Sequence, residues 1–235
     1  MRSIYVAANL GLPPHITACL FDLDGVITQT ATVHAQAWKQ VFDEVGVAFD
    51  PATDYADYVD GKPRLDGVRS VLAAREVPAT EELVGRIAAR KDQMFMDLIH
   101  EHGVQTYQTS IRYLETARQA GKRMAVVSSS KHTSEVLRAA RLDHFFDAQV
   151  DGNLAEREHL QGKPAPDTYL HAAHMLATPA HDAAVYEDAI AGVEAGRAGG
   201  FGLVVGVDRA GQADALRKHG ADVVVRDLGE LLQAA

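Results

Sequence analysis

Five short apolar runs divide the chain, and each is followed by polar, glycine-rich or helical-period residues. The runs occupy residues 18–21, 124–127, 184–186, 202–207 and 222–225. Continuous apolar runs rich in β-branched residues are typical of strands buried on both faces of a parallel sheet. Helical patterns at 109–120 and 189–198 lie between them. This alternation predicts an α/β fold with ligands bound at the carboxyl ends of the strands.

Residues 31–106 interrupt the alternation directly after the first run. Their polar and apolar positions predict helices at 33–45, 65–75 and 81–102. We therefore predict two domains. A Rossmann-like parallel-sheet core takes residues 1–30 and 107–235, and an inserted helical cap, residues 31–106, lies over the strand ends as a lid.

Composition excludes several classes of partner. The 235 residues carry a formal net charge of −9, which repels nucleic-acid phosphates and requires any phosphate site to concentrate positive charge locally. No apolar run approaches the roughly 20 residues that span a bilayer. Residues 1–17 lack the apolar core and cleavage site of a signal peptide, so we expect them to form a short extension before the first strand. Cys19 is the single cysteine, so no intrachain disulfide can form, and a reducing cytoplasm is expected. We also expect a monomer that binds neither membrane nor nucleic acid.

Two carboxylates follow the first predicted strand, in the sequence Phe21-Asp22-Leu23-Asp24-Gly25. Residues two apart share a face in extended chain, so both side chains can enter one site. Their mutual repulsion is relieved by a cation or a shared proton. A metal would keep Asp22 ionised and nucleophilic, while Asp24 would act as general acid and base if only its main-chain carbonyl met the metal. Taken alone, the pair is more typical of a solvated acidic turn.

Three more elements follow later strands or loops. Ser128-Ser129-Ser130-Lys131 could hold a phosphate with hydroxyl and helix N–H groups, although a serine N-cap is the simpler interpretation. Lys163 stands in a Pro-rich loop that would equally suit a surface lysine. Glu187 and Asp188 offer the oxygen ligands that Mg²⁺ prefers, although acids are also favoured at a helix N-terminus.

In this order, the four elements resemble the haloacid dehalogenase superfamily of phosphotransferases. The resemblance implies that Asp22 is the nucleophile that forms an aspartyl-phosphate and that Asp24 is the acid/base. It also implies that Ser128 and Lys163 bind the transferring phosphoryl group. The implied cofactor is Mg²⁺, with ligands from Asp22, the Asp24 carbonyl, Glu187 and Asp188. Because a carbon–halogen bond needs no acid for its leaving group, Asp24 fits phosphate-ester chemistry better than dehalogenation.

The predicted cap carries its own candidate residues. His34 and Trp38 are four apart on a predicted helix and could contact a sugar, but a packed amphipathic helix with Trp38 inside it is the simpler interpretation. Arg64 follows a Gly-Lys-Pro turn and could grip phosphate oxygens, or could belong to a solvated basic turn. Lys91 lies in a charged stretch whose simple interpretation is a solvated helical face.

Together with the core motifs, these cap residues resemble the β-phosphoglucomutase family. The resemblance implies an isomerase that interconverts β-D-glucose 1-phosphate and glucose 6-phosphate through a bisphosphate. A small-molecule sugar phosphate is the implied partner, bound by His34, Trp38, Arg64, Lys91, Ser130 and Lys131. The alternatives are a Mg²⁺-dependent sugar-phosphate phosphatase and, from another class, a non-catalytic metabolite-binding protein. A paired nucleophile and acid argue against the last, because a binding protein needs neither.

Four positions depart from the family pattern. Gln29 replaces an acid near the predicted hinge, and Gln108 stands where the chain usually returns to the core through Pro-Gly. Asp60 replaces a lysine and His132 an asparagine. These departures concern the hinge and the sugar site, and leave the phosphoryl-transfer motifs intact.

Overall fold

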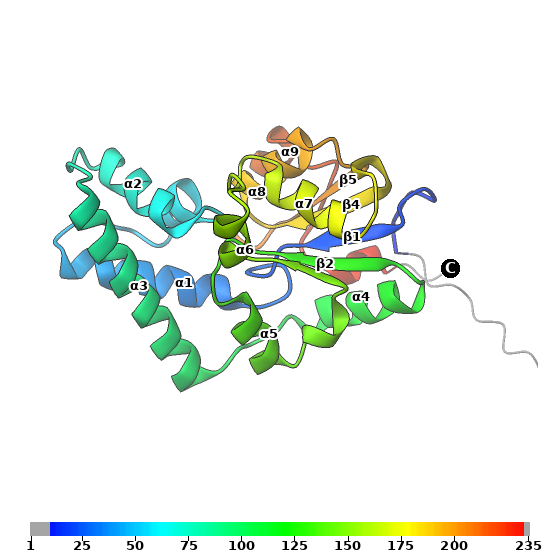
Figure 1. Cartoon of the computed structure of the whole chain (residues 1–235), viewed down its shortest axis with the longest axis horizontal. Helices are drawn as coiled ribbons and strands as arrows, with labels where there is room; N and C mark the ends of the chain where they lie inside the picture. Colours follow the sequence, from blue (N-terminus) through cyan, green and yellow to red (C-terminus); the bar gives the residue numbers. More distant parts are fainter. Residues whose placement is uncertain (1–9, 233–235) are drawn as a thin grey trace, which may run out of the picture.

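The computed structural model describes residues 10–232, in which helices cover both faces of a six-stranded, all-parallel sheet (Figure 1). The strand order is β3-β2-β1-β4-β5-β6. The strands are β1 (Ala18–Phe21), β2 (Arg123–Val127), β3 (Ala148–Val150), β4 (Ala183–Glu187), β5 (Leu203–Val207) and β6 (Val223–Val225). The predicted α/β class with a parallel sheet is confirmed. Residues 1–9 of the predicted N-terminal extension lie outside the described part.

Strand β1 lies inside the sheet, between β2 and β4, and all four of its residues are buried. Side chains alternate between the two faces, so Phe21 joins one apolar cluster and Leu20 the other. Phe21 pairs in register with Val126 of β2 and Tyr186 of β4. The polar residues that follow these three strands therefore meet at one edge of the sheet.

Helices pack on each face through large aromatic side chains. Tyr113 from α4 contacts Phe21 edge to face with ring centroids 6.2 Å apart, while Tyr169 from α7 lies in the cluster of Leu20 on the opposite face. The core helices are α4 (Gln108–Gln119), α5 (Thr133–Ala140), α6 (Gly152–Arg157), α7 (Asp167–Met175), α8 (Ile190–Ala198) and α9 (Ala213–Lys218). Short 3₁₀ turns complete the core: η2 (Asp143–Phe145), η3 (Ala180–Asp182) and η4 (Leu228–Leu231).

A helical segment between β1 and α4 projects from the sheet (Figure 1). We refer to this segment as the cap; it contains α1 (Thr30–Glu44), a π-helical turn η1 (Tyr55–Val59), α2 (Arg64–Ala74) and α3 (Glu81–His102). Trp38 stacks on Phe42 within α1, and both are buried. Two chain segments join cap and core side by side: Gln29 N–H donates to Gln105 O at 2.8 Å, and Tyr107 N–H to Ile27 O at 2.9 Å.

The elements agree in type with the sequence prediction, and α3 spans the predicted residues 81–102. Strand β3 and the helices α6 and α9 were not predicted, and helices were expected near α5 and α7 without predicted bounds. The assignment of residues 31–106 as a separate domain stays a prediction. None of the helices within residues 10–232 is long and apolar enough to cross a membrane.

Candidate active site

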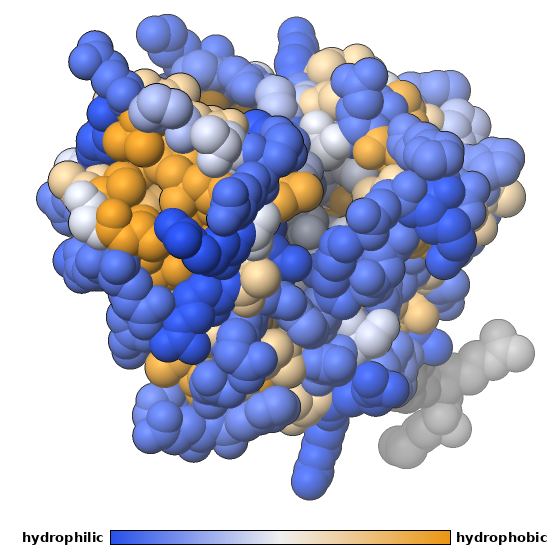
Figure 2. Space-filling model, turned by 60° about the vertical axis from the view of Figure 1, so that its left-hand side comes forward, coloured by the Kyte–Doolittle hydropathy of each residue, from blue (hydrophilic) through white to orange (hydrophobic). Residues whose placement is uncertain are grey.

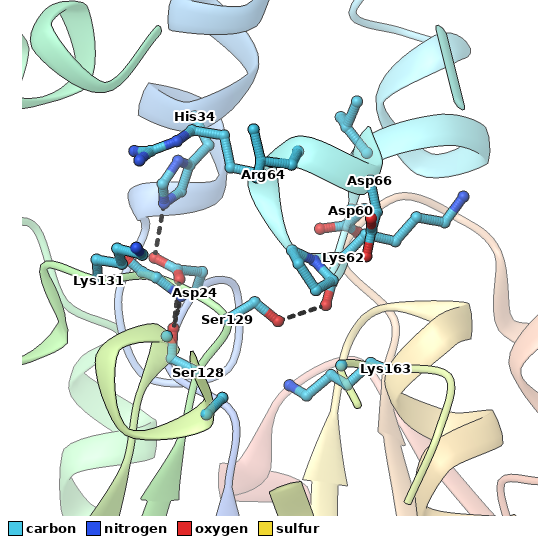
Figure 3. Close-up of a pocket in the computed structure, with 18 of the residues that line it drawn as sticks. Asp24, His34, Asp60, Lys62, Arg64, Asp66, Ser128, Ser129, Lys131 and Lys163 are labelled. Carbon is cyan, nitrogen blue, oxygen red and sulfur yellow. Dashed lines mark hydrogen bonds and ion pairs between the residues drawn. The ribbon is translucent and has the colours of Figure 1, made fainter. Parts of the chain in front are cut away.

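A cavity of about 780 Å³ lies between the cap and the carboxyl ends of the strands. Figure 2 shows this side of the molecule hollowed and bordered mainly by hydrophilic residues. The cavity wall includes residues from both parts of the chain, and Figure 3 shows His34 and Arg64 above Asp24 and Ser128. All the candidate residues named from the sequence line the cavity except Glu187, which is buried beneath it.

Asp22 stands at the first position beyond β1, where its main-chain N–H donates to Tyr186 O at 2.9 Å. Its Oδ1 lies 2.5 Å from Lys163 Nζ, and the lysine is 3% exposed. Lys163 Nζ also lies 2.5 Å from Glu187 Oε1 and donates to Val127 O at 3.3 Å. Burial opposes the charged form of Lys163, but the two carboxylates raise its pKa above the ordinary value. A permanently charged lysine is thus fixed beside the candidate nucleophile.

Three buried carboxylates gather around this point. Oxygens of Asp22, Glu187 and Asp188 lie within 4.8 Å of one another. Burial raises the pKa of Asp22 and of Asp188, and neighbouring carboxylates raise both further, while Lys163 opposes the rise at Asp22. Such a set of crowded hard oxygen donors fits a divalent cation, which would relieve the repulsion.

Glycine makes this crowding possible. Gly25 has a φ of +85°, and a Cβ there would stand 1.7 Å from Asp188 Oδ2. Its positive φ turns the chain between the two aspartates and the cap. The turn is also held from outside, because Arg209 Nε donates to Gly25 O at 2.8 Å and Gln212 Nε2 to Asp188 O at 2.9 Å.

Asp24 points away from the acidic cluster. Its Oδ2 accepts a hydrogen bond from Ser128 Oγ at 3.3 Å, and its Oδ1 accepts one from Thr30 Oγ1 and lies 3.5 Å from His34 Nε2 (Figure 3). Burial alone would raise the pKa of Asp24, but His34 and Thr30, with help from Lys91, lower it from 3.8 to about 2. The carboxylate is therefore ionised, which is the form that a general base requires. A contact of the Asp24 carbonyl with metal stays a prediction.

The cap contributes a buried basic group. Lys91 is 5% exposed, so it is not part of a solvated face, and its Nζ lies 2.5 Å from His34 Nδ1. The ammonium also lies 5.2 Å from the ring centre of Trp38 and 4.8 Å from that of Phe95, distances typical of cation–π contacts. Burial, with Arg64 nearby, lowers the pKa of Lys91 to about 7. Burial and Lys91 likewise lower the pKa of His34.

The candidates for a second phosphate site line the same cavity as Asp22. Arg64 forms an ion pair with Asp92, and Lys131 Nζ lies 2.5 Å from Glu156 Oε2. Ser130 Oγ accepts a hydrogen bond from His132 N–H at 3.1 Å. The structure thus brings a second group of cationic side chains to the same cavity, each already paired with a carboxylate. Their roles in binding stay predictions.

Several residues at the site were not predicted from the sequence. Tyr169 donates to Glu187 Oε1 at 2.8 Å and fixes that carboxylate, while Thr30 touches Asp24. Arg209 stacks on the Tyr107 ring, with its guanidinium carbon 3.6 Å from the ring centre. None of these contacts has a local sequence signal, although Thr30 could have been noticed as a hydroxyl residue six positions after Asp24.

Comparison with known proteins agrees with this geometry. A family model described as haloacid dehalogenase-like hydrolase matches residues 16–200, and the chain belongs to this family. The resemblance to the β-phosphoglucomutases is also confirmed. A β-phosphoglucomutase of Mycobacterium bovis is 49% identical, with 95% of this chain and 94% of the relative aligned.

Two further relatives carry the same name. A β-phosphoglucomutase of Bacillus subtilis is 33% identical, covering 91% of each chain. The crystal structure of a β-phosphoglucomutase from Clostridium difficile superposes with a TM-score of 0.79 at 27% identity, over 92% of this chain and 93% of that one. The expectation that the chain is an enzyme of this kind is therefore confirmed.

Proposed function

We propose that the chain is a phosphomutase that interconverts β-D-glucose 1-phosphate and glucose 6-phosphate through an aspartyl-phosphate at Asp22. The observation that carries the proposal is that one cavity holds two separate sets of cationic side chains. Lys163 contacts Asp22, whereas Arg64 lies on the cap and Lys131 follows the serines 128–130 of the core. A mutase needs both sites because its bisphosphate intermediate must be held in two opposite orientations.

The residues present can carry the steps of this reaction. With Asp22 phosphorylated, the ionised Asp24 would take the proton of a sugar hydroxyl while the hydroxyl oxygen forms a bond to phosphorus. The aspartyl oxygen–phosphorus bond then breaks, and Asp22 regains its carboxylate. In the return transfer the bisphosphate has turned round; a carboxylate oxygen of Asp22 forms the bond to phosphorus, the sugar oxygen–phosphorus bond breaks, and Asp24 gives its proton to the leaving sugar oxygen. Lys163 and Ser128 would hold the transferring group, and the closed cap would exclude water.

We assign the acidic cluster to Mg²⁺. Asp22, Glu187 and Asp188 supply its side-chain ligands, and a bound Mg²⁺ would neutralise charge on the transferring phosphoryl group. Lys163 opposes the rise in the pKa of Asp22 through its contact with Asp22 Oδ1, and Tyr169 fixes the Glu187 carboxylate by a hydrogen bond.

Chelation is expected to eliminate activity, and added Mg²⁺ to restore it, because the crowded carboxylates need a cation to stay ionised together. The measurement is mutase rate after exhaustive treatment with EDTA and after back-titration with Mg²⁺. EDTA saturated with Mg²⁺ beforehand serves as the control and should have no effect. Full activity in demetallated enzyme would exclude the metal.

The decisive experiment for the function is product analysis. Purified protein is incubated with β-D-glucose 1-phosphate, Mg²⁺ and a trace of glucose 1,6-bisphosphate, and both glucose 6-phosphate and free phosphate are measured. A mutase yields glucose 6-phosphate with little free phosphate. Release of phosphate alone, even when primed with bisphosphate, would replace the mutase by the sugar-phosphate phosphatase expected as the alternative.

Replacing Arg64 with Ala should separate transfer between sugars from simple hydrolysis. If Arg64 binds the phosphate that is not being transferred, the loss of its charge-assisted contact should slow mutase turnover by roughly 10–150-fold, equivalent to about 1.5–3 kcal/mol. Acetyl phosphate carries no second phosphate, so its hydrolysis should change far less. Both rates are measured on the same preparations, and an equal fall in both would remove Arg64 from this role.

The sequence also predicts a cytoplasmic monomer without a nucleic-acid partner. These expectations stay predictions, and gel filtration of the purified chain tests whether it is a monomer. A non-catalytic, metabolite-binding role would be indicated by binding of glucose phosphates without formation of either product.

A further inference from the structure

One carboxylate lies where the proposed second phosphate should bind. Asp92 projects from α3 into the cavity, and its Oδ1 contacts Arg64 Nη1. The same oxygen lies 2.9 Å from Nε2 of His132, which belongs to the core at the start of α5. A single carboxylate oxygen of the cap therefore pairs with one cationic side chain of the cap and one basic side chain of the core.

Both ring nitrogens of His132 face carboxylate oxygens. Nε2 lies 2.9 Å from Asp92 Oδ1, and Nδ1 lies 3.2 Å from Glu135 Oε2. Asp92 thus holds the His132 ring of the core in the same way as it holds Arg64 of the cap.

Arg64 is incompletely satisfied by Asp92. Its Nε is buried and has no hydrogen-bond partner among the described residues, although Nη1 is paired. Burial also lowers the pKa of Arg64, since water no longer solvates its charge fully. A guanidinium can use Nε together with an Nη to grip an anion in a fork, and the Asp92 contact leaves the Nε of Arg64 without a partner among the described residues.

We propose that Asp92 is an internal competitor for the distal phosphate: it holds Arg64 and His132 in the ligand-free enzyme and is displaced when a sugar phosphate binds. The inference rests on the proposed mutase function. A phosphate dianion has the greater charge and three free oxygens, so it can satisfy the fork of Arg64 and His132 together, which one carboxylate oxygen does not. A ligand that lacks a phosphate at this end leaves Asp92 in place.

The exchange makes Asp92 a specificity-determining residue. Ligands with a phosphate at this end of the cavity gain Arg64 and His132 but must first release them from Asp92. Neutral sugars and small esters gain nothing from that release. Asp92 should therefore lower the affinity for every ligand that binds through Arg64, and removing its charge should raise that affinity.

The test is the dissociation constant of glucose 6-phosphate, measured by calorimetry in the presence of Mg²⁺, together with KM and kcat for β-D-glucose 1-phosphate. Asp92→Asn should tighten both the dissociation constant and KM by roughly tenfold, the scale of one charge-assisted hydrogen bond. The change in KM should exceed any change in kcat. Asp92→Ala should tighten binding in the same direction, which guards against an effect peculiar to the amide.

Two controls separate competition from general electrostatics. Asp66 lines the same cavity but lies 3.6 Å from Arg69 instead of touching Arg64. Asp66→Asn removes the same charge and should leave the dissociation constant nearly unchanged. In an Arg64→Ala background, Asp92→Asn should lose most of its effect, because the two residues act through one contact.

Weaker or unchanged binding in both Asp92 variants would overturn the inference and make Asp92 a residue that orients Arg64. Equal tightening by Asp66→Asn, or tightening that persists fully without Arg64, would also overturn it. If wild-type protein forms glucose 6-phosphate normally while these results go against Asp92, only the inference fails. If wild-type protein neither binds nor converts glucose phosphates, the proposed function fails with it.

Discussion

Asp22→Asn is expected to abolish phosphoryl transfer, with a loss of at least about 10⁴-fold, the scale on which removing a covalent nucleophile is felt. An amide is a poor nucleophile and a weaker ligand for Mg²⁺. Mutase turnover and hydrolysis of acetyl phosphate should disappear together, because both pass through the same aspartyl-phosphate. Substantial turnover by pure Asp22→Asn protein would exclude the mechanism.

The loss should not come from unfolding. Burial and the neighbouring acids already disfavour the charge of Asp22 in the folded chain, and an amide of the same shape relieves that repulsion while keeping one hydrogen bond from Lys163 within reach. Thermal denaturation should therefore show a folded protein. Asp214→Asn, at an aspartate whose side chain is fully exposed on α9, is a matched control that should keep full activity.

Asp24→Asn is expected to slow transfer by about 10²–10⁴-fold, the usual range for general acid–base assistance. The amide cannot accept the proton of the sugar hydroxyl, although it can still bond Ser128 and Thr30. Binding of glucose 6-phosphate should remain measurable, so the defect belongs to kcat. An unchanged rate across the working pH range would remove Asp24 from the acid/base role.

Asp24→Asn should also change how the free energy of unfolding depends on pH. His34 and Thr30 hold the folded pKa of Asp24 at about 2, below its ordinary 3.8. The ionised carboxylate therefore contributes stability above about pH 4, and this contribution is lost as the pH falls from 3.8 toward 2. Asp24→Asn should remove that part of the acid dependence of unfolding, measured by denaturant titration between these limits.

The sequence predicted the sheet and brought the candidate acids together because both depend on short-range patterns. Each apolar run was long enough to identify its strand, and the acids that follow β1 and β4 necessarily share an edge once those strands pair. Strand β3 escaped because its residues, Ala-Gln-Val, form no apolar run, unlike the three valines of β6, which is equally short. Short helices such as α9 likewise lack enough turns to show a period.

The environment of the cap residues could not be read from spacing. Spacing alone favoured a packed Trp38, whereas the family resemblance implied a sugar contact; the side chain is buried and also borders the cavity beside Lys91. Lys91 looked like part of a solvated face, but the packing of α1 against α3 buries it against His34. The contact of Asp92 with His132 joins residues 40 apart from different parts of the chain, and no local pattern announces such a pair.

The pairing of β1 with β4 has a consequence for biosynthesis. Ala18 lies opposite Ala183, 165 residues farther along, so Asp22 is translated long before the strand that brings its acidic partners. Contacts this distant in sequence form slowly and late in folding. A nascent or truncated chain that ends before β4 holds Asp22 and Lys163 but neither Glu187 nor Asp188. Phosphoryl transfer should therefore appear only when the chain is almost complete, which makes catalysis itself a reporter of finished folding.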